Sequence, residues 1–305
     1  MRKCVIIMNP ESGKVKKLNG FKEFYDISRK YDYDTKIIFT KAKKDATEIV
    51  KNLPDDIDLV ISAGGDGTLN EVVTGNSERD KKLIISNLPM GTTNDVASMY
   101  GYTSNVLKNL EILLSGKKKS IDVCYINNKP FVYVACLGDY IDAAYNTPRN
   151  LKKKYGRLAY IIYGIKEFSK KINTYNIRYK IDGEEYTGRY SFIFITNSSR
   201  IGGVNDIYYD VKLDDNMFEV AFADIKNKKD MLKTLFLLSN IEIKDVPGIK
   251  YYQTNNLEIE FLNGPETSWC IDGEELDDKS STYTFKINKN MKMMVPEEKV
   301  GELFE

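Results

Sequence analysis

The stretch at residues 59–75 constrains the fold more than any other, because it joins an apolar run, a glycine cluster and an amphipathic segment. The apolar run at residues 59–63 predicts a buried strand, and the apolar spacing after Thr68 predicts a helix that begins there. Glycine permits positive φ and has no Cβ to hold a ligand away, so the three glycines between strand and helix predict a tight turn. These glycines are Gly64, Gly65 and Gly67.

A helix that begins at Thr68 is suited to an anionic ligand, because its first N–H groups are unpaired and its dipole places positive charge there. Asp66, inside the turn, is then suited to hold a metal ion or its hydration shell rather than the phosphate itself. Phosphoryl transfer is the first functional hypothesis. The alternative is a tight turn that serves packing only, since many glycine turns have no other purpose.

Length and composition bound the remaining classes of protein. The chain has 305 residues, for which two domains are expected, and 42% of them are hydrophobic, enough for sizeable cores. The 45 basic and 44 acidic residues give a net charge of +1, so we expect no nucleic-acid partner. Neither a signal peptide nor an apolar run of membrane-spanning length is recognisable, which predicts a soluble cytoplasmic protein.

The chain contains no histidine, which narrows the chemistry. A general base has to be an Asp, Glu, Lys, Tyr or Cys side chain, and histidine triads and histidine-ligated metal sites are excluded. The cysteines stand singly in apolar, strand-like segments without a Cys-x-x-Cys pair, so we expect reduced, buried thiols rather than disulfides or a zinc site. They are Cys4, Cys124, Cys136 and Cys270.

The first 125 residues alternate between strand and helix patterns, which predicts a parallel, doubly wound α/β layer. Ligands of such layers lie at the carboxyl ends of the strands, and three unusual loops fall there, at residues 9–14, 64–68 and 89–95. The predicted strands cover residues 4–8, 34–39, 57–62 and 83–88, and the predicted helices cover residues 18–30, 46–53 and 69–74, with another from about Asn94.

From about Cys124 the pattern changes to period-two strands, which predicts a β-rich second domain. The predicted strands cover residues 129–136, 175–181, 186–196, 218–223, 257–261 and 282–287, and predicted helices interrupt them around residues 158–168 and 231–238. The change of period places the domain boundary near residue 125.

Four motifs in order resemble the diacylglycerol kinase catalytic-domain family, and in particular its small soluble bacterial lipid kinases. They are Asn9-Pro10 with Ser12-Gly13, Gly-Gly-Asp-Gly-Thr-Leu-Asn-Glu-Val at residues 64–72, Pro-Met-Gly-Thr-Thr-Asn-Asp-Val-Ala at residues 89–97, and Ile-Asp-Gly-Glu at residues 271–274. The resemblance spans nearly the whole chain. It implies an α/β nucleotide-binding domain at residues 1–125, a β-sandwich domain at residues 126–295 that binds the lipid, and an active site in the cleft between them. Residues 296–305 are expected to return to the first domain.

The resemblance implies that the γ-phosphate of ATP passes to a lipid hydroxyl with the help of Mg²⁺. Contacts to the nucleotide are expected from Asn9, Lys14, Gly64, Gly65, Asp66, Gly67, Thr68, Gly91, Thr92 and Asn94, and contacts to its Mg²⁺, directly or through water, from Asp66, Asp95 and Asp122. Taken alone, residues 91–95 also suit an ordinary helix cap, Asp122 a solvated strand end and Lys14 a basic surface.

Asp272 is expected to act as the general base, assisted by Glu274, because the family carries its base at this position and the chain has no histidine. The alternative is a hairpin turn, since Asp-Gly is a leading turn signal. The same tripeptide, Asp-Gly-Glu, occurs at residues 182–184, where the pattern predicts a plain hairpin. Only the later copy follows Trp269 and stands at the position of the family motif.

The loop at residues 213–217 departs from the family pattern, in which Asp-Gly binds a structural metal ion. Asn216 replaces the glycine and tolerates positive φ, so we expect the turn to persist. Lys212 replaces a residue that often supplies an oxygen ligand, and it cannot bind a cation while charged. We therefore expect weak Mg²⁺ binding by Asp215 and the carbonyl of Met217, with an acidic turn without metal as the alternative.

The predicted activity is that of an ATP-dependent lipid kinase with diacylglycerol as the first substrate. Phosphatidylglycerol or another hydroxylated lipid is the next alternative, followed by an NAD kinase and by a noncatalytic regulator that binds nucleotide or lipid. A membrane-borne substrate implies peripheral contact with the anionic inner face of the membrane, for which the basic residues at 149–157 are the candidate surface. The sequence leaves a homodimer open.

Overall fold

The computed structural model describes the chain except for residues 19, 92–93, 139–171, 200–210, 239–240 and 264–267. Its N-terminal part is built around four parallel strands in the order β2-β1-β3-β4, as the alternating pattern predicts. These are β1 (Arg2–Met8), β2 (Tyr33–Phe39), β3 (Leu59–Gly64) and β4 (Ile84–Pro89). Parallel strands end at the same edge of a sheet, so the loops that follow them lie close together.

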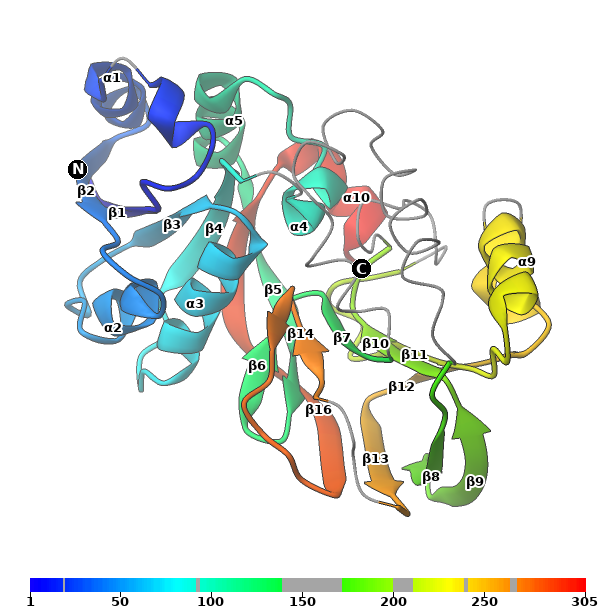
Figure 1. Cartoon of the computed structure of the whole chain (residues 1–305). Coiled ribbons are helices and arrows are strands. Elements are labelled where there is room, and N and C mark those ends of the chain that lie inside the picture. The colour runs from blue at the N-terminus through cyan, green and yellow to red at the C-terminus, as the bar shows by residue number, and fades with distance from the viewer. Residues whose placement is uncertain (19, 92–93, 139–171, 200–210, 239–240, 264–267) are drawn as a thin grey trace.

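Helices cover both faces of this parallel sheet (Figure 1). Strand residues alternate between the faces: Ile7 packs with residues of α2 and α3, whereas Ile6 packs with residues of α1 and α5. The helices are α1 (Lys22–Lys30), α2 (Asp45–Lys51), α3 (Asp66–Ser77), α4 (Asp95–Met99) and α5 (Val106–Leu114), with a 3₁₀ turn, η1, at Val15–Lys17. Burial of both faces explains why β1, β3 and β4 read as continuous apolar runs, whereas β2, at the edge of the sheet, is only partly buried.

The parallel sheet continues into antiparallel strands and reaches ten strands, in the order β2-β1-β3-β4-β16-β13-β8-β9, with β5 paired to β16 and β6 paired to β5. The added strands are β5 (Lys117–Ile126), β6 (Lys129–Phe131), β8 (Tyr175–Ile181), β9 (Glu184–Tyr190), β13 (Asn256–Phe261) and β16 (Thr282–Val295). β16 is parallel to β4 and antiparallel to β5 and β13. One strand therefore joins the N-terminal layer to the C-terminal half.

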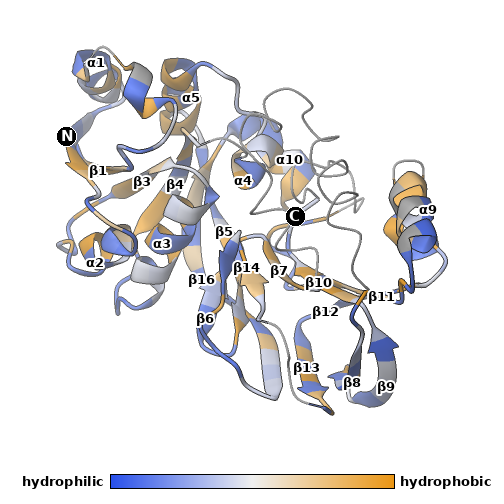
Figure 2. Cartoon of the chain, viewed as in Figure 1, coloured by the Kyte–Doolittle hydropathy of each residue, from blue (hydrophilic) through white to orange (hydrophobic). Residues whose placement is uncertain are grey.

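A second, antiparallel sheet has the order β12-β11-β10-β7-β14-β15. Its strands are β7 (Val134–Leu137), β10 (Phe192–Thr196), β11 (Phe218–Ala223), β12 (Ile249–Thr254), β14 (Cys270–Ile271) and β15 (Glu274–Glu275). The two sheets share a core that contains the single tryptophan, Trp269, with Tyr179 and Phe222. Figure 2 shows the apolar residues along the strands that form these layers. The predicted fold class, an α/β layer with a second β domain, is confirmed.

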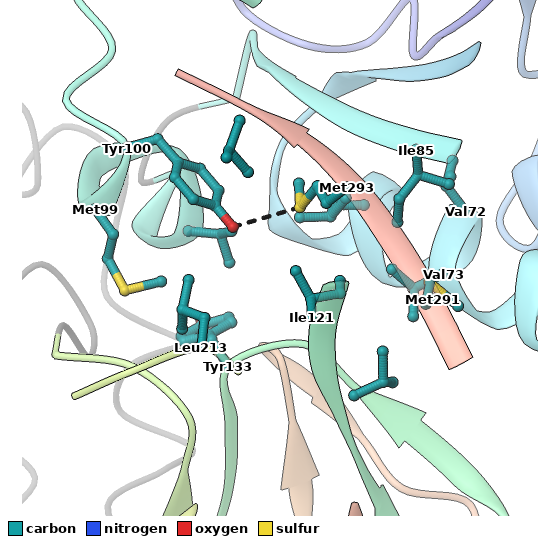
Figure 3. Packing of buried hydrophobic residues seen from close by; sticks show 14 of the residues in the cluster. Val72, Val73, Ile85, Met99, Tyr100, Ile121, Tyr133, Leu213, Met291 and Met293 are labelled. Atoms are coloured by element: carbon teal, nitrogen blue, oxygen red, sulfur yellow. Dashed lines mark hydrogen bonds between the residues drawn. The ribbon is translucent and has the colours of Figure 1, made fainter. Parts of the chain in front are cut away.

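The last residues of the chain pack on the N-terminal part. η3 (Glu297–Lys299) and α10 (Val300–Leu303) follow β16, and Leu303 and Phe304 belong to the same apolar cluster as Tyr100. Figure 3 shows part of this cluster, in which the Tyr100 hydroxyl donates to Met293 Sδ over 3.4 Å. The predicted domain boundaries stay a prediction, because the larger sheet runs across the one near residue 125.

The described helices between β11 and β12 are α9 (Lys228–Leu238), which includes the predicted helix at residues 231–238, and the 3₁₀ turn η2 (Ile243–Asp245). In the part of the chain that the structure describes, no helix has the length and apolar character needed to span a bilayer. The predicted helix at residues 158–168 lies outside the described residues. All four cysteines are buried and free, as predicted.

Two predicted strands are wrong because the chain changes sheet within each of them. Residues 186–196 form β9 in the larger sheet and β10 in the smaller one, with the change at Ser191. The buried Ser191 hydroxyl donates to Ala223 O over 2.9 Å and accepts from Ile225 N over 2.8 Å, so hydrogen bonds fix this crossing. Residues 129–136 likewise divide into β6 and β7.

Candidate functional site

Close packing, rather than the backbone angles, explains the glycine residues in the turn between β3 and α3. None of Gly64, Gly65 and Gly67 has a positive φ, so the expected left-handed turn is wrong. A Cβ on Gly64 would lie 2.3 Å from Thr68 Oγ1, and a Cβ on Gly67 would lie 3.5 Å from Glu274 Oε1. Glycine is needed at Gly64 because a neighbouring side chain occupies the space that a Cβ would take.

The loop after β4 lies directly against the glycine turn. A Cβ on Gly91 would lie 2.6 Å from the Cα of Gly65, and the Gly64 carbonyl accepts hydrogen bonds from Met90 N (2.8 Å) and Gly91 N (3.0 Å). Asn94, with a φ of 51°, closes this loop, because its side chain accepts from Gly91 N over 3.0 Å and donates to Gly91 O over 2.9 Å. The two predicted phosphate-binding loops are thus adjacent in space.

Asp66 begins α3 and connects the two loops through its carboxylate. Its oxygens accept hydrogen bonds from the backbone N–H groups of Asp95 (3.0 Å) and Val96 (3.2 Å), at the start of α4. Burial, and next the Asp95 carboxylate, raise the pKa of Asp66 to about 6. A cation beside this pair would offset the repulsion between the two buried carboxylates.

Asp272 lies at the end of β14, where its backbone has a φ of 48° and its side chain is buried. Four donors bind its carboxylate: Oδ2 accepts from Asn70 Nδ2 (2.7 Å) and Val132 N (2.6 Å), and Oδ1 accepts from Tyr133 N (3.0 Å) and Val134 N (3.1 Å). Burial raises the pKa of Asp272, and these hydrogen bonds oppose the shift. The carboxylate is thereby held in one orientation beside α3.

Glu274 begins β15 and contacts the N-terminal part of the chain. Its Oε2 lies 3.0 Å from Lys43 Nζ, and its Oε1 lies over Gly67 at the start of α3. The earlier copy of the tripeptide has another environment, since Asp182 lies in the turn between β8 and β9 and accepts from Thr254 Oγ1 over 2.9 Å. The predicted difference between the two copies agrees with these contacts.

Asn9 and Lys14 lie in the loop after β1 and reach the other two loops. Asn9 Nδ2 donates to Thr68 Oγ1 over 3.5 Å, and Lys14 Nζ donates to Pro89 O over 3.4 Å. Burial lowers the pKa of Lys14. Apart from Thr92, which lies outside the described residues, the predicted nucleotide contacts therefore gather at the carboxyl ends of β1, β3 and β4.

The contacts of Asp122 lead to another place, the loop at residues 213–217. Asp122 Oδ2 accepts from Asn216 N over 2.6 Å, and its Oδ1 lies 3.7 Å from Lys289 Nζ. Burial raises the pKa of Asp122 to about 6. Among the described residues, no hydrogen bond or ion pair joins Asp122 to Asp66, so the role of Asp122 at the nucleotide Mg²⁺ stays a prediction.

The loop at residues 213–217 keeps the predicted turn. Asn216 has a φ of 65°, as expected for a residue in the glycine position. Asp215 Oδ1 accepts from Met217 N over 2.9 Å. Lys212 Nζ donates to the backbone carbonyl of Glu302, near the C-terminus, over 2.8 Å. Lys212 therefore stabilises the attachment of the C-terminus instead of contributing an oxygen to the loop.

The carboxylates of the site suit Mg²⁺ that arrives with a nucleotide. Among the described residues, no three His, Cys, Asp or Glu side chains are grouped to hold a metal ion. Asp66 and Asp95 nevertheless offer neighbouring carboxylates, and Mg²⁺ commonly binds through one or two carboxylates together with phosphate oxygens and water. The described side chains therefore suit a site at which protein carboxylates and nucleotide phosphates bind Mg²⁺ together. Within the described part of the chain, protein side chains alone do not form a complete Mg²⁺ site.

Sequence reasoning missed residues that shape the site. Asn70 lies four positions after Asp66 on α3, and its amide reaches Asp272. The sequence could have indicated that Asn70 lies on the same side of the helix as Asp66, because residues four apart share a helix face. The sequence gives no such indication for two other contacts with the catalytic segment, which join distant parts of the chain. They are made by the N–H groups of residues 132–134 and by the side chain of Lys43.

Comparisons with known proteins agree on one family. Residues 3–126 match the family model described as the diacylglycerol kinase catalytic domain. A protein named diacylglycerol kinase from Staphylococcus aureus (strain bovine RF122 / ET3-1) is 27% identical over 302 residues, which cover 99% of this chain and 95% of that relative. Another of the same name, from Staphylococcus haemolyticus (strain JCSC1435), is 29% identical over 276 residues, which cover 90% of this chain and 83% of that relative.

Solved structures agree on the fold. A structure described as a diacylglycerol kinase from Bacillus anthracis str. Sterne aligns with a TM-score of 0.74 at 19% identity, covering 96% of this chain and 97% of that chain. A second structure from the same organism aligns with a TM-score of 0.79 at 21% identity and the same coverage. The resemblance carried by the four motifs is confirmed: residues 3–126 match the diacylglycerol kinase catalytic domain, and relatives named diacylglycerol kinase align with nearly the whole chain, which supports a lipid kinase.

Proposed function

We propose that the protein transfers the γ-phosphate of ATP to a hydroxyl group of a membrane lipid, with diacylglycerol as the first candidate. The observation that carries this proposal is the meeting of three distant parts of the chain at the start of α3. The loop at Gly91 contacts the glycine turn at residues 64–68, and the segment at residues 272–274 contacts Gly67 and Asn70 of α3. A surface suited to phosphate therefore adjoins a carboxylate suited to proton transfer.

The nucleotide phosphates would bind the N–H groups at the start of α3, together with the Lys14 ammonium. Gly65 and Gly91 let the two phosphate-binding loops meet, because a Cβ on Gly91 would lie 2.6 Å from the Cα of Gly65. Asp66 and Asp95 are the residues that would hold Mg²⁺, which when bound neutralises phosphate charge. The same pair keeps the two loops in register through the hydrogen bond from Asp95 N to Asp66.

Asp272 would accept the proton of the lipid hydroxyl. Its carboxylate already accepts four hydrogen bonds, which is about its full capacity, so the hydroxyl has to replace one donor. The donors at residues 132–134 are backbone N–H groups beside β7, whereas the Asn70 amide is a side chain that can change rotamer. We therefore infer that the lipid hydroxyl replaces Asn70 on Oδ2. The raised pKa of Asp272 favours acceptance of the proton.

The lipid substrate requires contact with a membrane. We propose a cytoplasmic protein that binds the anionic inner face of the membrane peripherally and brings Mg²⁺-ATP to it. The basic surface expected at residues 149–157 lies outside the described residues and stays a prediction, as does a homodimer. A weak structural Mg²⁺ at Asp215 and the Met217 carbonyl belongs to the same proposal and needs waters as further ligands.

The proposal is tested by incubating the full chain with γ-labelled ATP, Mg²⁺ and vesicles that each contain one candidate lipid, with NAD in a separate reaction. We expect label in phosphatidic acid when diacylglycerol is present. Label in phosphatidylglycerol or another lipid alone would reassign the substrate. Label in NAD, or nucleotide binding without transfer to any acceptor, would contradict the proposal.

A further inference from the structure

Lys43 lies in the loop after β2, at the edge of the sheet where the phosphate-binding loops also lie. β2 is parallel to β1, and β1 is parallel to β3, so the segments that follow these strands emerge on the same side. Lys43 follows the end of β2 at Phe39 by four positions. Its ammonium is therefore a cation that a fourth loop brings toward the site.

The loop that carries Lys43 is fixed to α3. The Glu71 carboxylate, on α3, accepts hydrogen bonds from Lys44 N (2.8 Å) and Ala46 N (3.1 Å), and the Thr47 hydroxyl donates to Glu71 O over 3.0 Å. Lys44 has a φ of 69°, which turns the chain between the loop and α2. The base of the Lys43 side chain is thus held next to the helix that begins at the glycine turn.

The ammonium of Lys43 ends on a carboxylate of the proposed catalytic segment. Lys43 Nζ lies 3.0 Å from Glu274 Oε2, and Glu274 Oε1 lies 3.5 Å from where a Cβ on Gly67 would stand. The pair is solvent-exposed, with 64% of the Lys43 side chain and 46% of the Glu274 side chain accessible. An ion pair between two such exposed side chains is weak, so a ligand with more negative charge can replace Glu274 as the partner of Lys43.

We propose that Lys43 binds the γ-phosphate of the nucleotide, and that Glu274 holds the Lys43 side chain in place until the nucleotide arrives. The inference rests on the proposed function and names a residue of the same site. A phosphate at the first turn of α3 would lie beside Gly67, where it meets the ammonium now bound to Glu274. Phosphate oxygens bind ammonium groups by charge-assisted hydrogen bonds, which are stronger than those between neutral groups.

The exchange also has a consequence for Glu274. A carboxylate next to a transferring phosphoryl group repels it, and Lys43 reduces this repulsion by standing between the two charges. When Lys43 moves to the phosphate, Glu274 is released near Asp272 before the phosphoryl group is transferred. Nucleotide binding would therefore prepare the lipid side of the site.

The test compares binding of a non-hydrolysable ATP analogue and of ADP, with Mg²⁺ and without lipid, so that no lipid phosphate contributes. Lys43→Ala should weaken the ATP analogue about tenfold and leave ADP within about twofold, because ADP lacks the γ-phosphate. Lys43→Arg should retain most of the affinity. Lys41→Ala, which removes another exposed lysine of the same loop, should change neither ligand and controls for the general loss of positive charge.

Steady-state kinetics give a second measurement of the same inference. Lys43→Ala should raise the KM for ATP. In the binding experiment, Glu274→Gln should not weaken the ATP analogue, because Glu274 pairs with Lys43 only before the nucleotide binds. Equal losses for ADP and the ATP analogue, or no loss for either, would overturn the role of Lys43 while leaving the kinase proposal in place. Failure of the unmodified protein to bind either nucleotide would overturn both.

Discussion

The side-chain amide of Asn70 donates a hydrogen bond to Asp272 Oδ2 over 2.7 Å, although 202 positions separate the two residues in the sequence. Asn70 belongs to the helix whose first turn would bind the phosphates, and it lies four residues after Asp66. Four residues of α-helix span about 6 Å. The helix therefore sets the distance between the phosphate-binding turn and the carboxylate that would accept the proton.

Asp272→Asn should lower turnover at least about 100-fold with little change in nucleotide affinity, because it removes the proton acceptor and keeps the shape of the side chain. Asp182→Asn is the matched control, since Asp182 has the same Asp-Gly-Glu context but lies in the hairpin between β8 and β9. Initial rates with labelled ATP and a separate binding titration measure the two effects. Similar rates for both variants would remove Asp272 from its proposed role.

Asn70→Ala should move the acidic limb of the pH–rate profile to higher pH. The Asn70 hydrogen bond lowers the pKa of Asp272, so its loss raises this pKa further. The ionised form needed to accept a proton is then reached only at higher pH, and the variant should regain turnover as the pH rises. Profiles of kcat/KM from pH 5 to 9 measure the shift. A profile that only drops in height, with its acidic limb unmoved, would speak against this link.

Gly91→Ala should lower both stability and activity, because its Cβ would lie 2.6 Å from the Cα of Gly65 and the backbones would have to separate. Such overpacking costs about 1–3 kcal/mol in the free energy of unfolding. Gly13→Ala is the control in a neighbouring loop, since nothing lies within 4 Å of its Cβ position and its φ is not positive. Denaturant unfolding and the KM for ATP measure the difference, and equal behaviour of the two variants would contradict the close approach of the loops.

Glu219→Gln should stabilise the protein increasingly as the pH rises from about 5 to 8. Glu219 is 1% exposed, its Oε2 has no hydrogen-bond partner among the described residues, and burial raises its pKa from 4.5 to about 8. Between these values the folded state holds a proton that the unfolded state releases, so the free energy of unfolding of the unmodified protein falls as pH rises. Glutamine removes this term, which changes by at most about 1.4 kcal/mol per pH unit.

Denaturant unfolding at pH 5, 6.5 and 8 measures the growing difference between Glu219→Gln and the unmodified protein. Glu258→Gln serves as a control, because Glu258 is half exposed and lies 3.9 Å from Lys180 on the surface of the sandwich. A constant difference at all three pH values for Glu219→Gln would show that this carboxyl group is ionised in the folded protein throughout the range.

The parallel layer was predictable from the sequence because local patterns and tertiary contacts agree there. β1, β3 and β4 are buried along most of their length, and the four predicted strands match the observed ones to within about two residues. Ser191 shows the opposite case. The apolar pattern continues through residues 186–196, and only the hydrogen bonds of a buried serine direct the chain from one sheet to the other.

The second half of β16 was also missed, because the prediction covered only residues 282–287. Residues 288–292 are mostly polar and carry no strand pattern, yet β16 continues to Val295 through a bulge between Asn288 and Met291. A bulge breaks the period of two on which strand prediction depends. Pairing with β4 and β5, which the sequence does not report, stabilises this part of the strand.

The motifs predicted which loops meet, and the individual hydrogen bonds required the structure. Gly65 and Gly91 follow neighbouring parallel strands, so their proximity follows from topology. The backbone donors on Asp272 come from residues 132–134, which no motif marks, and Asp122 contacts a loop more than 90 positions away. Such contacts depend on how the second sheet packs against the first.

The place of β16 in the larger sheet has a consequence for synthesis of the chain on the ribosome. Ile85 of β4 pairs with Met293, so its neighbour is made only after the roughly 200 residues that separate the two strands. At ordinary rates of translation this interval is roughly 10–40 s, during which the edge of β4 has no native partner on that side. Open strand edges associate readily with other chains. Nascent chains that stop before β16 would therefore be liable to aggregate, because β4 gains its partner on that side only once β16 has been made.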